Sequence, residues 1–225
     1  MYTLNWGPPV GITSVSEEFL ELLDKDSKDL TEDARKDLAG VIKDEKYYLK
    51  EDYEKFINHL SPHINEYLND VKSRAADHID WSKLRWNLDR IWINRQHKNE
   101  YNPPHDHVGD ISFVIYLNVP QEIYKEDPDI PELKWPGLFS FITGFNNFLK
   151  YGTVTRGVDP FIAHVQQQFD NRSQHTLQPK TGDMFLFPSY LTHTVNAFSA
   201  DVERVSVSGN ITLFNSDMVE QNGNR

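Results

Sequence analysis

From about residue 88 to residue 214, short runs of alternating apolar and polar residues recur, and this pattern constrains the fold more than any other feature. A period of two is typical of strands that bury one face. Turn signals rich in Pro, Gly, Asn and Asp separate the runs, as at residues 102–104, 135–137 and 180–183. Many short strands with such spacing indicate a β-sandwich or barrel. The predicted strands are residues 89–96, 111–117, 138–143, 161–167, 184–187, 193–198 and 203–214.

The first third of the chain instead carries apolar residues at helical spacing. Ser16 is a suitable N-cap for a helix that begins at Glu17. A second helix is predicted from Thr31 to Ile42, and a third from Ser61-Pro62, with the proline at its first position. We therefore expect a mainly β fold with flanking helices (α+β). One domain would span residues 1–225, with a helical region (1–87) packed outside a β core (88–214) and a polar tail (215–225).

The composition excludes several classes of site. The chain of 225 residues has no cysteine, which removes thiol nucleophiles, cysteine-ligated zinc and disulfides, and leaves His, Asp and Glu as strong metal ligands. No apolar run reaches the length of a membrane span, and the N-terminus does not resemble a secretion signal, so we expect a cytoplasmic protein. The formal net charge of -11 disfavours a broad nucleic-acid contact, because such surfaces are basic.

The segment His105-Asp106-His107 follows two prolines and precedes the predicted strand 111–117. In an extended segment the imidazoles of His105 and His107 would share a face, while Asp106 would point away. Two imidazoles that project together form a chelating pair, and Asp110 could turn back as an oxygen ligand. The sequence therefore predicts one metal ion bound between this cluster and the distant His193.

A polar strand face follows His193. Ten residues lie between His193 and Arg204, and Arg204 begins a strand on which Ser206, Ser208 and Asn210 share its face. Such a face inside a barrel is costly unless it binds something. A carboxylate is the natural partner of a guanidinium, which binds it through two parallel hydrogen bonds. The order of these elements predicts an anion site beside the metal.

At these residues the chain resembles the 2-oxoglutarate/Fe(II)-dependent oxygenase superfamily, and especially its small members from bacteria and tailed phages. The resemblance rests on residues 101–107, 112–117 and 179–188, on His193 and on Arg204-Val205-Ser206, and it covers about residues 88–214. It implies a double-stranded β-helix (jelly-roll, cupin-like) core. It also implies Fe(II) bound by His105 and His193, and 2-oxoglutarate as a cosubstrate held by Arg204 with help from Ser206, with O2 as the oxidant.

The resemblance has two further consequences for the site. Asn94 and Tyr116 occupy positions from which related enzymes often contact the cosubstrate. The family pattern has an Asp or Glu two residues after the first histidine, where this chain has His107. Either three histidines bind the metal, as in cupin-type sites, or Asp110 supplies the carboxylate. A neutral third ligand would leave the site more positive.

The implied activity is hydroxylation of an unknown substrate, coupled to formation of succinate and CO2, with a peptide or amino-acid side chain favoured. The alternative is a cupin-like metal-binding isomerase, or a small-molecule binding protein that does not use 2-oxoglutarate. Arg204 distinguishes the oxygenase from the cupin-like alternative, because a protein that does not use 2-oxoglutarate needs no arginine to bind its carboxylate. The glycine-containing segment 144–159 is a candidate lid, or else a plain surface insertion.

Overall fold

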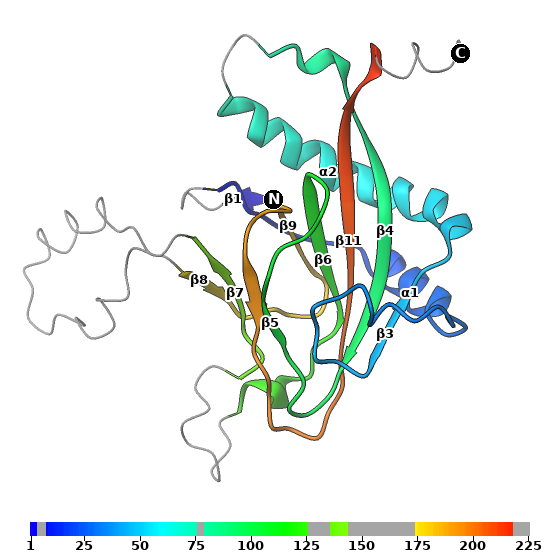
Figure 1. Cartoon of the computed structure of the whole chain (residues 1–225), viewed down its shortest axis with the longest axis vertical. Helices are drawn as coiled ribbons and strands as arrows, with labels where there is room; N and C mark the ends of the chain where they lie inside the picture. Colours follow the sequence, from blue (N-terminus) through cyan, green and yellow to red (C-terminus); the bar gives the residue numbers. More distant parts are fainter. Residues whose placement is uncertain (4–7, 76–78, 126–135, 144–173, 218–225) are drawn as a thin grey trace, which may run out of the picture.

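A computed structural model describes residues 1–3, 8–75, 79–125, 136–143 and 174–217. Within these ranges the strands form two antiparallel sheets that lie against each other, and two helices cover the outer side of the larger sheet (Figure 1). The larger sheet has seven strands, in the spatial order β1 (Tyr2–Thr3), β2 (Gly11–Ser14), β9 (Asp183–Pro188), β6 (Ile111–Asn118), β11 (Arg204–Asn215), β4 (Leu84–Gln96) and β3 (Asp44–Tyr47). The smaller sheet has four, in the order β5 (Asn102–His105), β10 (His193–Val195), β7 (Phe139–Ile142) and β8 (Gln174–Leu177).

β11 lies between β4 and β6, and its two faces carry different kinds of side chain. Val205, Val207 and Ile211 are buried in the core under the helices. Arg204 and Ser206 face the smaller sheet, because successive side chains of a strand point to opposite faces. The space between the sheets holds a second, largely aromatic core, formed mainly by Val114, Tyr116, Phe139, Phe141, Phe185, Phe187, Val195 and Phe198.

The helix α1 (Glu17–Asp26) begins where the sequence predicts. The Ser16 hydroxyl accepts a hydrogen bond from the Phe19 backbone N–H at 3.3 Å. The second helix, α2 (Tyr53–Ser73), packs a stripe of Phe56, Leu60, Ile64 and Tyr67 onto the larger sheet. Short 3-10 helices cover Lys50–Asp52, Trp81–Lys83 and Gln121–Tyr124.

The predicted helix over residues 31–42 is wrong, because this segment forms turns and isolated bridges. Ala34 and Ile42 are buried, as their spacing suggested, but the backbone of Val41 pairs with Tyr101 from a distant part of the chain. Contacts between remote segments therefore override the local helical pattern. Residues 1–87 contribute β1, β2 and β3 to the larger sheet in addition to the two helices.

The start of the third predicted helix is also wrong. The helix α2 begins at Tyr53, so Pro62 lies inside it and not at its first position. Proline removes one backbone donor from the helix interior. The neighbouring Ser61 hydroxyl donates to the Ile57 carbonyl at 2.6 Å, and the buried apolar stripe holds the helix together on either side.

Most strand predictions are confirmed. β6, β7, β9 and β11 agree with the predicted ranges within two residues, whereas β4 begins earlier and β10 ends earlier. The sequence patterns missed β1, β2, β3, β5 and β8. The predicted strand 161–167 and the candidate lid 144–159 lie outside the described residues, as does most of the tail. Among the residues that are described, no helix is both long and apolar enough to cross a membrane.

Candidate metal and anion site

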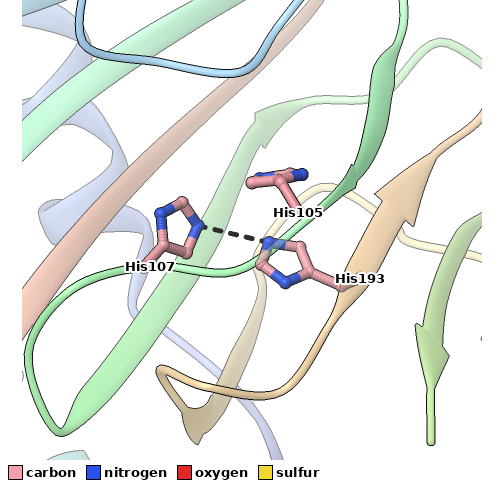
Figure 2. Close-up of side chains that lie close together, drawn as sticks. All are labelled: His105, His107 and His193. Carbon is pink, nitrogen blue, oxygen red and sulfur yellow. Dashed lines mark hydrogen bonds between the residues drawn. The ribbon is translucent and has the colours of Figure 1, made fainter. Parts of the chain in front are cut away.

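Three histidine side chains converge between the two sheets (Figure 2). His105 ends β5 and His193 begins β10, and the two are direct cross-strand partners, so their side chains share a face. His107 follows β5 by two residues, where its backbone N–H donates to the Ser189 carbonyl at 2.9 Å. The ring centroids are 4.2 Å apart for His105 and His193, 4.9 Å for His105 and His107, and 5.0 Å for His107 and His193.

Backbone carbonyl groups orient two of these rings. The Nδ1 atom of His193 lies 2.9 Å from the Leu191 carbonyl oxygen, and that of His105 lies 2.7 Å from the Pro103 carbonyl oxygen. A carbonyl oxygen can only accept, so each Nδ1–H donates and each Nε2 keeps its lone pair. The Nε2 atom of His107 lies 3.2 Å from that of His193. The candidate ligand nitrogens, one from each histidine, all lie within 4.8 Å of one another.

The three imidazoles are suited to bind a metal ion. Burial lowers the pKa of each: that of His107 falls to about 4, with a contribution from nearby His105, and that of His193 falls well below its usual range. The neutral imidazole favoured in this way is the form that binds metals. With metal–nitrogen bonds of about 2.1 Å, ligands at right angles are about 3.0 Å apart, close to the observed separation of His107 and His193.

Asp110 lies outside this cluster. Its side chain is exposed, and its Oδ2 accepts a hydrogen bond from the Leu213 backbone N–H at 2.7 Å. Its own backbone N–H donates to the Ile211 carbonyl at 2.9 Å, which ties the residue to β11. Asp106 is exposed as well. Among the described residues, the cluster that could hold a metal consists of His105, His107 and His193 alone.

Arg204, the first residue of β11, is buried with 2% of its surface exposed. Its guanidinium donates to the Gly137 carbonyl and to the side-chain oxygen of Gln96, and its central carbon lies 5.9 Å and 5.8 Å from the ring centres of Tyr116 and Phe198. Burial lowers the pKa of this group, but an arginine remains charged in proteins. It forms no ion pair within the described part of the chain. A buried cation that lacks a carboxylate partner is suited to bind an anionic ligand.

A pocket that is partly open to solvent joins the histidines to Arg204. A row of cross-strand partners runs along its wall, from Tyr116 on β6 through Ser206 on β11 to Asn94 on β4. All the residues predicted for the cosubstrate therefore lie in the same pocket as the histidine cluster.

The sequence patterns did not identify three further polar residues of the pocket: Gln96, Glu45 and Asn102. Gln96 is the cross-strand partner of Arg204, and only the register of β4 and β11 reveals this. Glu45 follows a segment that was predicted to be helical. Asn102 belongs to the stretch that carries the family resemblance, which was the one available signal.

Aromatic side chains complete the walls beside the cluster. The Phe139 ring stacks on His193 at 5.4 Å between centroids and an interplanar angle of 18°. The Trp92 ring lies 5.4 Å from that of His107. These rings shield the imidazoles from bulk water and help to keep them neutral.

Residues 90–210, more than half of the chain, match the family model described as "Putative 2OG-Fe(II) oxygenase". The matched segment contains the histidine cluster, Arg204 and the row from Tyr116 to Asn94. No curated protein matches the chain in sequence.

Solved structures of three other proteins have a similar fold. The viral collagen prolyl hydroxylase of Paramecium bursaria Chlorella virus-1, in its 2-oxoglutarate complex, gives a TM-score of 0.51 at 14% identity, covering 90% of this chain and 94% of that one. A 2OG-Fe(II) oxygenase family oxidoreductase from Burkholderia pseudomallei gives 0.53 at 13% identity, with coverages of 90% and 85%. HygX from Streptomyces hygroscopicus, with nickel, 2-oxoglutarate and hygromycin B bound, gives 0.51 at 10% identity, with coverages of 90% and 82%. The two sheets thus form the predicted double-stranded β-helix, and the chain belongs to the 2OG-Fe(II) oxygenase family of oxidoreductases.

Proposed function

We propose that this oxygenase hydroxylates its substrate with Fe(II) held by His105, His107 and His193, and with 2-oxoglutarate held by Arg204. The observation that carries the assignment is a single pocket with two different ends. One end presents three buried imidazoles, and the other presents a buried guanidinium with no carboxylate partner in the described chain. A metal ion and a dicarboxylate are the ligands that these two ends select.

The choice of His107 over Asp110 as the third ligand rests on position. The His107 ring faces His193, whereas the Asp110 carboxylate binds the backbone of β11. A site with three neutral ligands keeps the full charge of the metal ion. Such a site would attract the carboxylates of 2-oxoglutarate more strongly than one that includes an aspartate, because no protein charge offsets that of the metal.

Arg204 would bind one carboxylate of 2-oxoglutarate. The Gly137 carbonyl and the Gln96 side chain fix the plane of the guanidinium before the ligand arrives, which reduces the entropy lost on binding. Burial raises the pKa of Tyr116, so its phenol keeps its proton and can donate to a carboxylate. Ser206 and the second amide N–H of Asn94, in the same row, are placed to contact the ligand, which leaves the side-chain oxygen of Asn94 without a partner.

When bound, the iron and 2-oxoglutarate supply the oxidising chemistry, in which O2 converts the cosubstrate to succinate and CO2 and one oxygen atom enters a C–H bond of the substrate. The protein's part is to orient the ligands and to exclude water. Leu191 and Pro103 carbonyls hold the ring orientations of His193 and His105, and Phe139 and Trp92 cover the cluster.

A peptide or amino-acid side chain is the proposed substrate. The similar fold of a collagen prolyl hydroxylase favours this choice, although the likeness itself concerns only the fold. The alternative activity, a metal-dependent isomerase or binding protein without 2-oxoglutarate, draws its support from the three-histidine cluster. Membership of the oxygenase family and the buried Arg204 both weigh against it.

The proposal can be tested under anaerobic conditions. Adding Fe(II) and 2-oxoglutarate to the wild-type protein should produce the weak visible charge-transfer band of a bound complex, and admission of O2 should yield succinate. Arg204→Ala should lose the band at 2-oxoglutarate concentrations that saturate the wild type, while its Fe(II) affinity stays within about twofold. His193→Ala should lose both Fe(II) binding and succinate formation.

Arg90→Ala is the matched control, because Arg90 also lies on the large sheet but is exposed and pairs with Asp37. This variant should bind 2-oxoglutarate as the wild type does. If Arg204→Ala bound 2-oxoglutarate with unchanged affinity, the assignment of the cosubstrate to Arg204 would be wrong. A wild-type protein that showed neither band nor succinate would contradict the proposed function as a whole.

A further inference from the structure

Three side-chain oxygens in the pocket have no hydrogen-bond partner, although they are buried. They belong to Glu45 on β3, Asn94 on β4 and Asn102 on β5: the Oε2 of the glutamate and the Oδ1 of each asparagine. Glu45 and Asn94 are buried to 98% and 94%, since only 2% and 6% of their surfaces are exposed. A buried polar atom without a partner costs free energy, and folded proteins contain few of them. Three such atoms on one pocket indicate that the missing partner is a ligand.

The neighbouring Glu100 shows how the fold satisfies a buried carboxylate that has a structural role. One oxygen of Glu100 accepts from the Lys43 backbone N–H at 3.3 Å, and the other accepts from the His97 backbone N–H at 2.9 Å. Glu45 lies on β3, two residues after Lys43, and has no ion pair in the described chain. Arg35, whose charge acts on Glu45, is bound to Asp33. The Oε2 atom of Glu45 therefore has no partner among the described residues and could accept a hydrogen bond from a ligand.

The three residues line the same pocket as the histidine cluster and come from both sheets. Glu45 and Asn94 are direct cross-strand partners, so their side chains share the inner face of the large sheet. Asn102 lies on the same strand as His105 and approaches from the smaller sheet. A Cβ atom at Gly40 would stand 2.5 Å from the Asn102 Oδ1 and 2.7 Å from the Glu45 Oε1. The absence of a side chain at Gly40 thus keeps the space between these two residues open.

The chemistry of this group of oxygens selects a donor-rich cation. Asn94 donates its amide N–H to the Ser208 hydroxyl at 3.5 Å, whereas its side-chain oxygen has no partner. A primary ammonium carries only donors, and its positive charge would offset that of the Glu45 carboxylate. Leu38, Ile42 and Trp92 line the same pocket and offer an apolar wall to an alkyl stem. The net charge of -11 would also attract a cationic substrate.

Burial and the nearby Glu100 raise the pKa of Glu45 to about 7. This shift agrees with a carboxylate that lacks its partner, because a bound cation would favour the charged form.

We propose that Glu45, Asn94 and Asn102 form the substrate subsite of this enzyme and bind a primary ammonium group at the end of an alkyl chain, as in a lysine side chain. The proposal rests on the proposed function, since it names the substrate class for that metal site. The ammonium group would be bound in the pocket while a carbon of the alkyl stem lies nearest the histidine cluster.

Calorimetry can measure the binding of two pairs of probes. The measurement is made on the protein loaded anaerobically with Fe(II) and 2-oxoglutarate, and again on the metal-free protein. Nα-acetyl-L-lysine N-methylamide is compared with its uncharged norleucine analogue, and n-butylammonium with 1-butanol. We expect the charged member of at least one pair to bind at least tenfold more tightly. A preference confined to the capped lysine would indicate a peptide substrate, and one for butylammonium as well would indicate small amines.

Glu45→Gln should remove this preference, and Gly40→Ala should weaken it, because its methyl group would stand between Glu45 and Asn102. Asp44→Asn is the matched control: it neutralises the adjacent acid, which is partly exposed and points to the other face of β3. The control should bind like the wild type. Equal binding of charged and neutral probes to the wild type, or an unchanged preference in Glu45→Gln, would overturn the inference.

The melting temperature without probe gives a second, independent measurement. At a pH above the Glu45 pKa of about 7, Glu45→Gln should melt at or above the temperature of the wild type, because the substitution removes an unpaired buried charge. A clearly lower melting temperature would mean that the fold itself uses the carboxylate, and would also overturn the inference.

If the wild type forms the Fe(II)–2-oxoglutarate band but shows no preference for the charged probes, the subsite fails and the proposed function stands. If the band is absent, the proposed function fails instead.

Discussion

Arg204 and Gln96 are direct cross-strand partners on β11 and β4, and the guanidinium of Arg204 donates to the side-chain oxygen of Gln96. The amide group of Gln96 donates in turn to the backbone carbonyls of Glu100 and Asn196. These two acceptors fix the orientation of the Gln96 amide, because only its nitrogen can donate to them, and its oxygen therefore faces Arg204. A neutral acceptor at this place orients Arg204 without neutralising it, and the charge remains available for an anionic ligand.

Gln96→Glu should therefore weaken 2-oxoglutarate binding. The new carboxylate would pair with Arg204 and repel the carboxylate of the ligand, so we expect the dissociation constant to rise at least tenfold, which corresponds to about 1.4 kcal/mol. Fe(II) binding should stay unchanged. The variant also loses the donors to two backbone carbonyls, and we expect its free energy of unfolding to fall by about 1–3 kcal/mol.

The control for this experiment is Asn118→Asp. Asn118 is an exposed amide on β6 whose side chain donates to the Glu203 carbonyl outside the pocket. Titration of the charge-transfer band with 2-oxoglutarate should give the wild-type affinity for Asn118→Asp and a reduced one for Gln96→Glu. Equal affinities in all three proteins would show that Arg204 does not anchor the cosubstrate.

Substitutions at His107 and Asp110 decide the third metal ligand. His107→Ala should reduce Fe(II) affinity by more than about a hundredfold, since even partners of metal ligands are worth about 10–100-fold. His107→Asp should retain binding, because a carboxylate would then stand at the position where the family pattern has one. Asp110→Ala should bind Fe(II) like the wild type and lose only the hydrogen bond to Leu213, at a cost of up to about 1 kcal/mol in stability. Anaerobic calorimetric titration with Fe(II) measures all three, and a large loss in Asp110→Ala would reverse the assignment.

Much of the site could be predicted from sequence because its residues lie on strongly patterned segments. His105 and His107 lie just before the apolar strand β6, and Arg204 opens the long strand β11, so local periodicity placed each on the inner face. The resemblance to a known family then supplied the pairing of segments that are distant in the chain. The structure brings His105, His107 and His193 together with Arg204, as these two lines of reasoning implied.

The missed features depend on contacts that no local pattern encodes. Pro103 and Pro104 suggested a turn, yet they lie in β5, which is an edge strand of the smaller sheet and can therefore accept residues that lack an N–H donor. The segment before Glu45 has helical spacing, but its backbone pairs with remote partners, and β3 adds to the edge of β4. Glu45 thus reached the pocket through an edge strand that the sequence did not reveal.

Gly209→Ala should destabilise the protein, because β11 passes very close to its neighbours at this residue. A Cβ atom there would stand 2.5 Å from the Phe113 ring and 2.9 Å from the Arg90 carbonyl oxygen, which belongs to the paired backbone of β4. Neither group can move without disturbing the core or the sheet. We expect the free energy of unfolding, measured by urea denaturation, to fall by about 1–3 kcal/mol. Unchanged stability would mean that β11 can shift freely, which would weaken the case for a preorganised Arg204.

The free energy of unfolding should depend on pH through the protonation of Glu45. Its pKa of about 7 in the folded protein lies above the usual value of 4.5. Burial is the main cause of this increase, followed by repulsion from Glu100. The charge of Asp33 also raises the pKa, whereas that of Arg35 lowers it. The folded state therefore binds the proton more tightly than the unfolded state. The resulting stabilisation is present in full below about pH 4.5 and is lost as the pH rises to about 7.

Because the histidines also titrate, the measurement is the difference between the wild type and Glu45→Gln, which cancels their contribution. Urea denaturation of the metal-free proteins at a series of pH values should show the wild type losing up to about 3 kcal/mol relative to the variant between pH 4.5 and 7. A saturating concentration of a bound primary amine should reduce this loss, since the cation favours the charged carboxylate. A difference that stays constant with pH would show that the Glu45 carboxylate already has a partner in the folded protein, and that no ligand is needed to explain its burial.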